Sequence, residues 1–177
     1  MSSTPDSPKS IVYRLDEALI SDGNIPYPGI DIFVPLVSTY TPNLGVVSMQ
    51  PPEQTAQLLI RAGLGQWFKK VRSRQSAETE IDLYAAIATD LGVSPNNSIV
   101  VDTSPIGIFA ARRLGYYSIG LVVDKFKIRP GELIEAGAHC VAADHLAVSG
   151  YIDDVMGIKP ITKESKIEAI EEGGALC

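Results

Sequence analysis

Short apolar runs alternate with helical patterns along most of this chain, and that alternation restricts the fold more than any other feature. The run SIVV at 98–101 is typical: it leads into Asp102, and a helical pattern follows at 105–114. Parallel strands need crossover connections long enough to hold a helix, so this alternation is typical of a parallel sheet. The pattern predicts an α/β fold, a doubly wound parallel sheet of about five strands with helices on both faces.

The expected elements can be placed by residue number. Strands are expected at 11–15, 44–48, 98–101, 117–123 and 139–142, and a short edge strand within 67–72. Helices are expected at 30–40, 51–64, 80–91, 105–114 and 130–136, where apolar residues recur at helical spacing. These elements form one core domain at 10–157, between a disordered lead at 1–9 and a charged tail at 158–177.

Composition excludes several classes of function. The 177 residues carry a formal net charge of -6, which argues against binding to nucleic acid or to an anionic membrane. No segment reaches the roughly 20 apolar residues that a membrane-spanning helix needs. The opening residues MSSTPDSPKS lack the apolar region of a secretory signal, so we expect a cytoplasmic protein.

Candidate site residues lie where the expected strands end, because ligands of open parallel sheets bind beyond the carboxyl ends of the strands. The residues at those positions are Arg14 to Asp16, Ser48, Asp102 to Ser104, and Asp124.

A long segment of the chain resembles a known family. Residues 82–120, which include DLYAAIATDLGVSP and IVVDTSPIGIFAARRLGYYSIG, resemble the haloacid dehalogenase superfamily, especially its β-phosphoglucomutase and phosphoglycolate phosphatase branch. Weaker similarity extends through PYPG at 26–29, the segment 44–68 and HCVAADHLAV at 139–148. The resemblance covers about 11–150 and implies the fold of that superfamily.

The resemblance also implies a nucleophile, and this chain departs from it there. Family members place an Asp nucleophile at the end of the first strand and a second Asp, the general acid and base, two residues later. The matching positions hold Arg14 and Asp16, and Glu17 replaces the glycine that follows. A guanidinium stays protonated, so it can neither attack phosphorus nor ligate Mg²⁺.

The implied phosphate and metal groups are also changed. Ser48 matches the Ser or Thr that holds the phosphoryl group, but Glu78 stands where the family has a lysine. The pair of metal-binding acids matches Asp102 and Thr103, so one acid is replaced by an alcohol. The dozen or so residues between the first strand and PYPG are too few for the family's helical cap.

These losses predict a protein without phosphatase activity or a cofactor, whose role is binding, regulatory or structural. Because Arg14 and Glu78 have exchanged charges, one hypothesis is that they form an ion pair, together with Asp102, that closes the former site. The alternative is that Glu78 lies solvated on a mobile loop and that the exchange of charges is chance. The remaining pocket is expected to hold a small anion through Arg14, Ser48 and the backbone N–H groups around Thr103 and Ser104.

Three alternatives stay open. The chain is alternatively a divergent Mg²⁺-dependent phosphatase that acts on a small phosphorylated metabolite, using Asp16 or Asp102 with the metal. A protein partner is a second alternative. A homodimer that uses the surface left open by the missing cap is a third, with Tyr27, Phe33 and Tyr40 as candidate contact residues.

Overall fold

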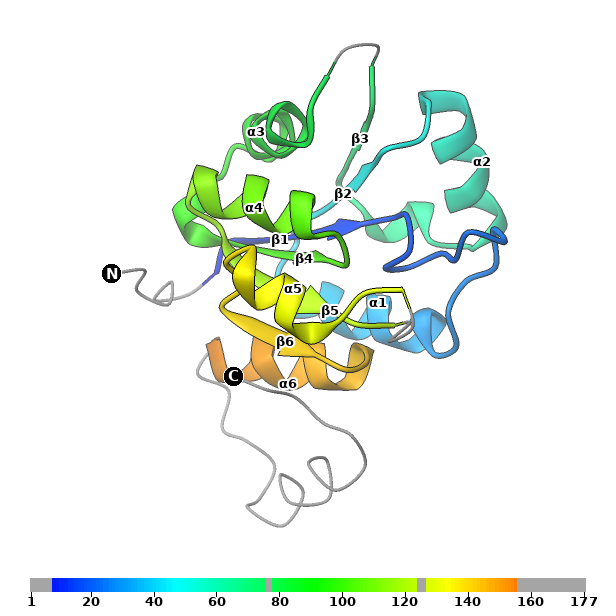
Figure 1. Cartoon of the computed structure of the whole chain (residues 1–177). Helices are drawn as coiled ribbons and strands as arrows, with labels where there is room; N and C mark the ends of the chain where they lie inside the picture. The colour runs from blue at the N-terminus through cyan, green and yellow to red at the C-terminus, as the bar shows by residue number, and fades with distance from the viewer. Residues whose placement is uncertain (1–7, 76–77, 124–126, 156–177) are drawn as a thin grey trace.

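The computed structural model describes residues 8–75, 78–123 and 127–155, which form a six-stranded parallel sheet with helices on both faces (Figure 1). The strands are β1 (Ser10–Arg14), β2 (Leu44–Ser48), β3 (Lys70–Ser73), β4 (Ser98–Asp102), β5 (Tyr117–Leu121) and β6 (Cys140–Ala142). The helices are α1 (Ile30–Ser38), α2 (Pro52–Arg61), α3 (Glu80–Leu91), α4 (Pro105–Leu114), α5 (Pro130–Glu135) and α6 (His145–Val155). Short 3-10 turns occupy η1 (Gly65–Trp67) and η2 (Pro95–Asn97).

The strand order is β3-β2-β1-β4-β5-β6. The strands that follow β1 are added on one side of it up to β3, and those from β4 onward are added on its other side. The chain moves outward from β1 to β3, returns to the centre through α3, and then moves outward again to β6. This is the doubly wound arrangement expected from the sequence, and the crevice above β1 and β4 is where such sheets bind ligands. The sixth strand is β3, the edge strand that the sequence placed within 67–72.

Helices cover both faces of the sheet because apolar side chains of β1 point alternately to one face and to the other. Ile11 and Tyr13 pack into the cluster that includes α1, α2 and α6, whereas Val12 faces the cluster formed by α3 and α4. Alternate residues of a strand point to opposite faces, so a continuous apolar run such as IVY requires helices on both sides. In Figure 1, α4 lies between α3 and α5 on one face, and α1 lies beside α6 on the other.

The connection from β1 to α1 occupies residues 15–29 and contains turns and isolated bridges rather than a helix. Its fold depends on local backbone bonds: Glu17 N donates to the Ile20 carbonyl at 2.8 Å, and Tyr27 N donates to the Leu19 carbonyl at 3.1 Å. Glu17 has φ 61°, the left-handed conformation that glycine adopts most easily. Glu17, which stands where the resemblance implies a glycine, therefore has a backbone conformation that glycine adopts more easily.

Capping residues fix where the two site-bearing helices begin. Thr79 Oγ1 accepts from the Asp82 N–H and the Asp82 carboxylate accepts from the Thr79 N–H, a reciprocal capping box at the start of α3. Ser104 precedes α4, and its hydroxyl accepts from the Gly107 N–H. The starts of α3 and α4 therefore have defined positions beside the ends of the central strands.

Some predictions concern residues that the structure does not describe, and one is wrong. The predicted tail at 158–177, and all but the last two residues of the lead at 1–9, lie outside the described residues. Phe33 is only 6% exposed and packs edge-on against Tyr13 at 5.9 Å, so the prediction that it offers a contact surface is wrong. Within the described part of the chain, the helices lack the length and apolar character needed to cross a bilayer.

Candidate functional site

Three adjacent strands end at the same edge of the sheet with polar side chains. Arg14 is the last residue of β1, Ser48 the last of β2 and Asp102 the last of β4. The strands are parallel and neighbouring, so these ends meet at the crevice where the strand order reverses. The structure therefore brings together residues that lie up to 88 positions apart in the sequence.

Arg14 holds two acids at this edge. Its Nη1 atom lies 2.7 Å from Glu80 Oε1 and 3.7 Å from Asp102 Oδ2. The side chains of Arg14 and Glu80 are 14% and 12% exposed, and that of Asp102 is fully buried. Burial opposes the charge on Arg14, but the neighbouring Asp102, Tyr84 and Glu80 outweigh burial and raise the pKa of the guanidinium. Arg14 is thus a permanent cation in a largely buried cluster.

The partner of Arg14 is Glu80 and not the predicted Glu78. Glu78 lies in the loop before α3, where its carboxylate accepts a hydrogen bond from Gln75 N at 2.7 Å. Glu80 is the first residue of α3, and the cap at Thr79 directs that position toward the end of β1. The predicted pair of Arg14 with Glu78 is therefore wrong, and Arg14 pairs instead with an acid two residues further along the chain.

Asp102 is held by hydrogen bonds as well as by Arg14. Its Oδ2 accepts from the Tyr84 hydroxyl at 2.6 Å, and its Oδ1 accepts from Ser104 N at 2.7 Å. Burial raises the pKa of Asp102, and the nearby Arg14 and these two donors only partly counteract that effect. A Cβ atom at Gly107 would lie 2.6 Å from Asp102 Cγ, so only glycine leaves room for the carboxyl group here.

Asp16 and Ser48 form a second polar pair at the end of β2. Ser48 Oγ donates to Asp16 Oδ1 at 3.1 Å, and Met49 N donates to Asp16 Oδ2 at 2.6 Å. Ser48 Oγ also accepts from Gln50 N at 3.1 Å. The two predicted residues are therefore adjacent, and both carboxylate oxygens of Asp16 bond to the chain around the end of β2.

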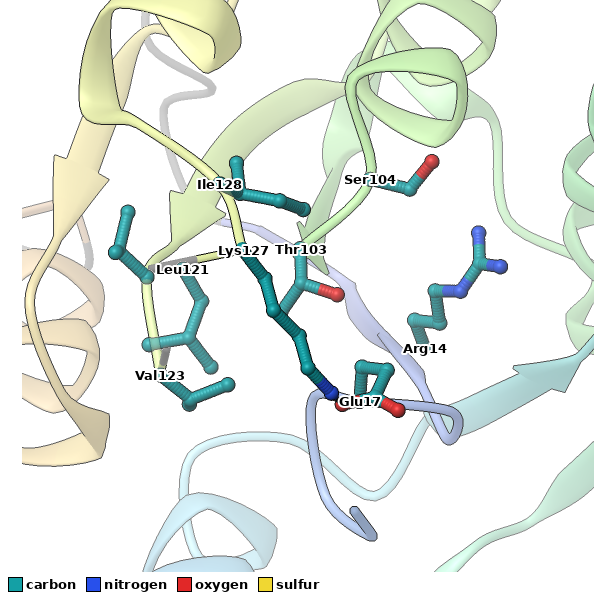
Figure 2. Close-up of a pocket in the computed structure, with 9 residues that line it drawn as sticks. Arg14, Glu17, Thr103, Ser104, Leu121, Val123, Lys127 and Ile128 are labelled. Carbon is teal, nitrogen blue, oxygen red and sulfur yellow. Dashed lines mark ion pairs between the residues drawn. The ribbon is translucent and has the colours of Figure 1, made fainter. Parts of the chain in front are cut away.

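A pocket of about 120 Å³ opens beside the Arg14 cluster (Figure 2). Its polar lining comes from Arg14, Glu17, Thr103, Ser104 and Lys127, and its apolar wall from Leu121, Val122, Val123 and Ile128. Of the predicted site residues, Arg14, Thr103 and Ser104 line this pocket. Asp16, Ser48, Glu78 and Asp102 are not among its lining residues.

Two lining residues, Glu17 and Lys127, were not predicted as site residues. Lys127 Nζ lies 2.7 Å from Asp22 Oδ2 and 3.8 Å from Glu17 Oε2, and Figure 2 shows its side chain extending to Glu17. The rule that ligands bind beyond strand ends could have indicated Lys127, because it follows β5. The residue that the sequence predicts at this strand end is Asp124, which lies outside the described residues.

Comparison with solved structures identifies the fold of this chain. No protein-family model and no curated protein matches this sequence. A haloacid dehalogenase-like hydrolase from Streptococcus pneumoniae is 11% identical, with a TM-score of 0.72 over 81% of this chain and 97% of that one. A haloacid dehalogenase family hydrolase from Deinococcus radiodurans, solved with bound phosphate and sodium, is 15% identical, with a TM-score of 0.69 over 88% and 100% of the two chains. This chain has the haloacid dehalogenase-like fold.

The fold implied by residues 82–120 is thereby confirmed. The structural neighbours include a β-phosphoglucomutase homologue from Thermotoga maritima, 20% identical with a TM-score of 0.60. That match covers 75% of this chain but 59% of the other, so this chain spans less than two thirds of its length. Identities this low show the shared fold and leave the activity of this haloacid dehalogenase-like chain to its own residues.

The residues at this edge do not fit the magnesium ion that the resemblance implies. Mg²⁺ needs several oxygen ligands in a near-octahedral arrangement, and carboxylates must be ionised to bind it. Asp102 already accepts two hydrogen bonds, has a raised pKa and lies 3.7 Å from a cation, while Thr103 offers only a hydroxyl. The described residues contain no group of three or more His, Cys, Asp or Glu side chains suited to a metal. No reaction step is therefore assigned to a metal here.

Proposed function

We propose that this haloacid dehalogenase-like chain does not transfer phosphoryl groups, and that its sheet edge has a structural and ligand-binding role. The observation that carries the proposal is the position of Arg14 at the end of β1, with Nη1 2.7 Å from Glu80 Oε1. The resemblance implies a carboxylate nucleophile at this position. A guanidinium has no electron pair available to attack phosphorus.

The surrounding charges support the same proposal. Phosphoryl transfer requires positive charge that neutralises the transferred group. Here Arg14 is shared between Glu80 and the buried Asp102, so its charge is already balanced by carboxylates. Asp16 is the one acid retained from the implied catalytic pair. Its carboxylate accepts hydrogen bonds from the Ser48 hydroxyl and from Met49 N.

The test is hydrolysis of an aryl phosphate by the full chain, with and without Mg²⁺. We expect no Mg²⁺-dependent turnover above that of a buffer blank. Magnesium-dependent turnover that disappears in Asp16→Asn but persists in Asp31→Asn, an exposed acid of α1, would contradict the proposal and support the divergent phosphatase. Turnover that survives both Asp16→Asn and Asp102→Asn would come from a contaminant.

The proposal includes the expected location and partners. A cytoplasmic location is part of this proposal, and so is the binding of a small ligand or a protein partner. The pocket of about 120 Å³ favours a small ligand, because it combines an apolar wall with hydroxyl and charged groups. Size-exclusion chromatography with light scattering tests the homodimer, which would elute at about twice the mass of 19.0 kDa.

A further inference from the structure

The outer side of β3 is an open edge of the sheet. β3 is the last strand in the order, and among the described residues it pairs with β2 alone. Arg74 N donates to the Ser48 carbonyl at 2.9 Å, so every second residue before Arg74 also faces β2. The residues in between, Val71 and Ser73, therefore direct their backbone N–H and C=O groups away from the sheet. We call this row of backbone groups, with the side chains of residues 69–74, the β3 edge.

The side chains of the β3 edge carry an excess of positive charge. Lys69, Lys70, Arg72 and Arg74 lie in this short segment, although the whole chain has a net charge of -6. Arg72 Nε lies 3.5 Å from Asp90 Oδ2 of α3. The other three cations are exposed and make no ion pair with the described residues. Their charges are therefore available to a partner.

The acids of the neighbouring elements do not neutralise this charge. Glu78, in the loop after β3, accepts a backbone hydrogen bond within that loop, and Asp82 belongs to the capping box at the start of α3. Glu80 pairs with the cation at the end of β1, and Glu53 lies in the first turn of α2. Among the described residues, Asp90 alone forms an ion pair with a cation of the β3 edge. An anionic segment that approaches the edge therefore meets three unpaired cations.

The side chains of β3 alternate between the two faces of the sheet, and Figure 1 shows the strand between α2 and α3. Arg72 is level with Val47 on the α3 face, where Lys70 also lies, and Val71 is level with Val46 on the α2 face. Val71 is 41% exposed. A strand added beyond β3 would place side chains beside these residues on both faces. The β3 edge therefore suits an extended segment in which acidic and apolar residues alternate.

We propose that the β3 edge binds an extended acidic segment of a protein partner, which adds a strand to the sheet. The backbone groups of Val71 and Ser73 pair with that segment, and the cations of the edge select acidic side chains. A nucleic acid lacks the alternating backbone donors and acceptors that such pairing needs. A second copy of this edge would place like charges opposite one another, which is unfavourable.

This proposal gives a place and a chemical class to the protein partner of the proposed function. It does not depend on the loss of phosphoryl transfer, because peptide binding and turnover are measured separately. Failure of one therefore leaves the other standing.

The experiment titrates the full chain with the peptide EVEVEVE, blocked at both ends, and follows binding by amide NMR shifts and amide hydrogen exchange. The matched peptide EVEPEVE has the same charge, but its proline removes a backbone donor and disfavours pairing. We expect EVEVEVE to bind roughly tenfold more tightly than EVEPEVE, the effect of one or two backbone hydrogen bonds. We expect KVKVKVK not to bind.

Hydrogen exchange reports whether a strand is added. Bound EVEVEVE should slow the exchange of the Val71 and Ser73 amides, which face outward in the free chain. The amide of Arg74, already bonded to the Ser48 carbonyl, is the internal reference and should not change. Binding through charge alone would leave all three amides unchanged.

Charge-reversal variants test the electrostatic part of the proposal. Lys70→Glu should weaken EVEVEVE binding about threefold to tenfold, because an attractive cross-strand pair becomes a repulsive one. The matched control is Arg113→Glu on the exposed side of α4, which changes the net charge equally and should leave binding unchanged. If far-ultraviolet circular dichroism shows that Lys70→Glu is unfolded, Arg74→Glu replaces it with the same expectation.

The proposal is overturned if EVEVEVE does not bind, if EVEPEVE binds as tightly, or if binding leaves the exchange of Val71 unchanged. Equal losses in Lys70→Glu and Arg113→Glu would also overturn it, because only net charge would then matter. Slow exchange of Val71 and Ser73 in the free chain would mean that the edge is already occupied, by a second copy if the protection depends on concentration and by the chain itself if it does not. Tighter binding of oligothymidylate at the same amides would overturn the proposal in favour of a nucleic acid.

Discussion

Replacing Arg14 with methionine measures what the buried cation contributes, because methionine keeps an apolar stem of similar length. Asp102 is fully buried and Glu80 is 12% exposed, so both carboxylates lose a cation that lies 3.7 Å and 2.7 Å away. Removing one member of a buried ion pair typically costs about 3–5 kcal/mol. Arg14 is 14% exposed, so we expect the free energy of unfolding to fall by about 3 kcal/mol, the lower end of that range.

Urea unfolding followed by the fluorescence of Trp67, the only tryptophan, measures this loss. For a domain of this size, about 1 kcal/mol corresponds to about 2–4 °C in Tm, so the expected decrease is about 6–12 °C. The control is Arg129→Met, which breaks an exposed pair with Glu132 and should change the free energy of unfolding by less than about 0.5 kcal/mol.

The loss in Arg14→Met should also depend on pH. Arg14 lowers the pKa of Asp102 that burial raises, so removing the cation raises that pKa further. The folded variant then binds this proton more tightly than the unfolded chain, whose Asp titrates near about 3.9. Its stability increases as the pH falls toward that value, and the difference from the wild type narrows. A loss equal to that of Arg129→Met, or one that does not narrow on acidification, would refute the reasoning.

Three further predictions use the same unfolding measurement. Gly107→Ala should lower the free energy of unfolding by about 1–3 kcal/mol because its Cβ would crowd Asp102, whereas Gly150→Ala, with open space around its Cβ, should not destabilise. Burial lowers the pKa of both His145 and His139 to about 4, so each should cost stability as the pH falls from about 6.5 to 4. His145→Phe should remove the His145 part, up to about 3 kcal/mol, and leave the part that comes from His139. Thr79→Ala removes the α3 cap and should cost about 1 kcal/mol, and an unchanged urea midpoint would contradict the role of the cap.

The sheet and its helices could be predicted because local signals and burial agree in this chain. The helix predicted at 80–91 has these bounds in the structure, since Thr79 caps its start and Gly92 ends it with φ 67°. The strand at 117–123 ends two residues earlier than expected, at Leu121, the last residue that pairs with β6. Apolar periodicity continues past that point, and pairing with the neighbouring strand decides where the element stops.

The partner of Arg14 could not be predicted by counting residues. Counting back from Asp82 leads to Glu78, but the helix begins only after Thr79, so Glu78 belongs to the loop. Glu78 and Glu80 are two residues apart in the sequence, and the position of the helix cap at Thr79 decides which of them lies beside the end of β1. The sequence therefore indicates an acid near Arg14, and the identity of that acid required the structure.

The pocket could not be predicted because its contacts join two connections that are far apart in the sequence. Lys127 and Asp22 are 105 positions apart, and they meet only because the connections that follow β1 and β5 reach the same edge. A lysine and an aspartate in two loops carry no local signal that they will pair. Their pairing follows from strand order, which the alternation of elements restricts but does not fix.

The charges at the end of β1 form one unit rather than a set of separate losses. With Arg14 in place, a lysine at Glu80 would leave two cations beside the single buried carboxylate of Asp102, and like charges in low dielectric surroundings repel strongly. Conversely, an aspartate at position 14 alone would leave three carboxylates together without a cation. Each of these single charge reversals is therefore expected to be less stable than the present arrangement of Arg14, Glu80 and Asp102.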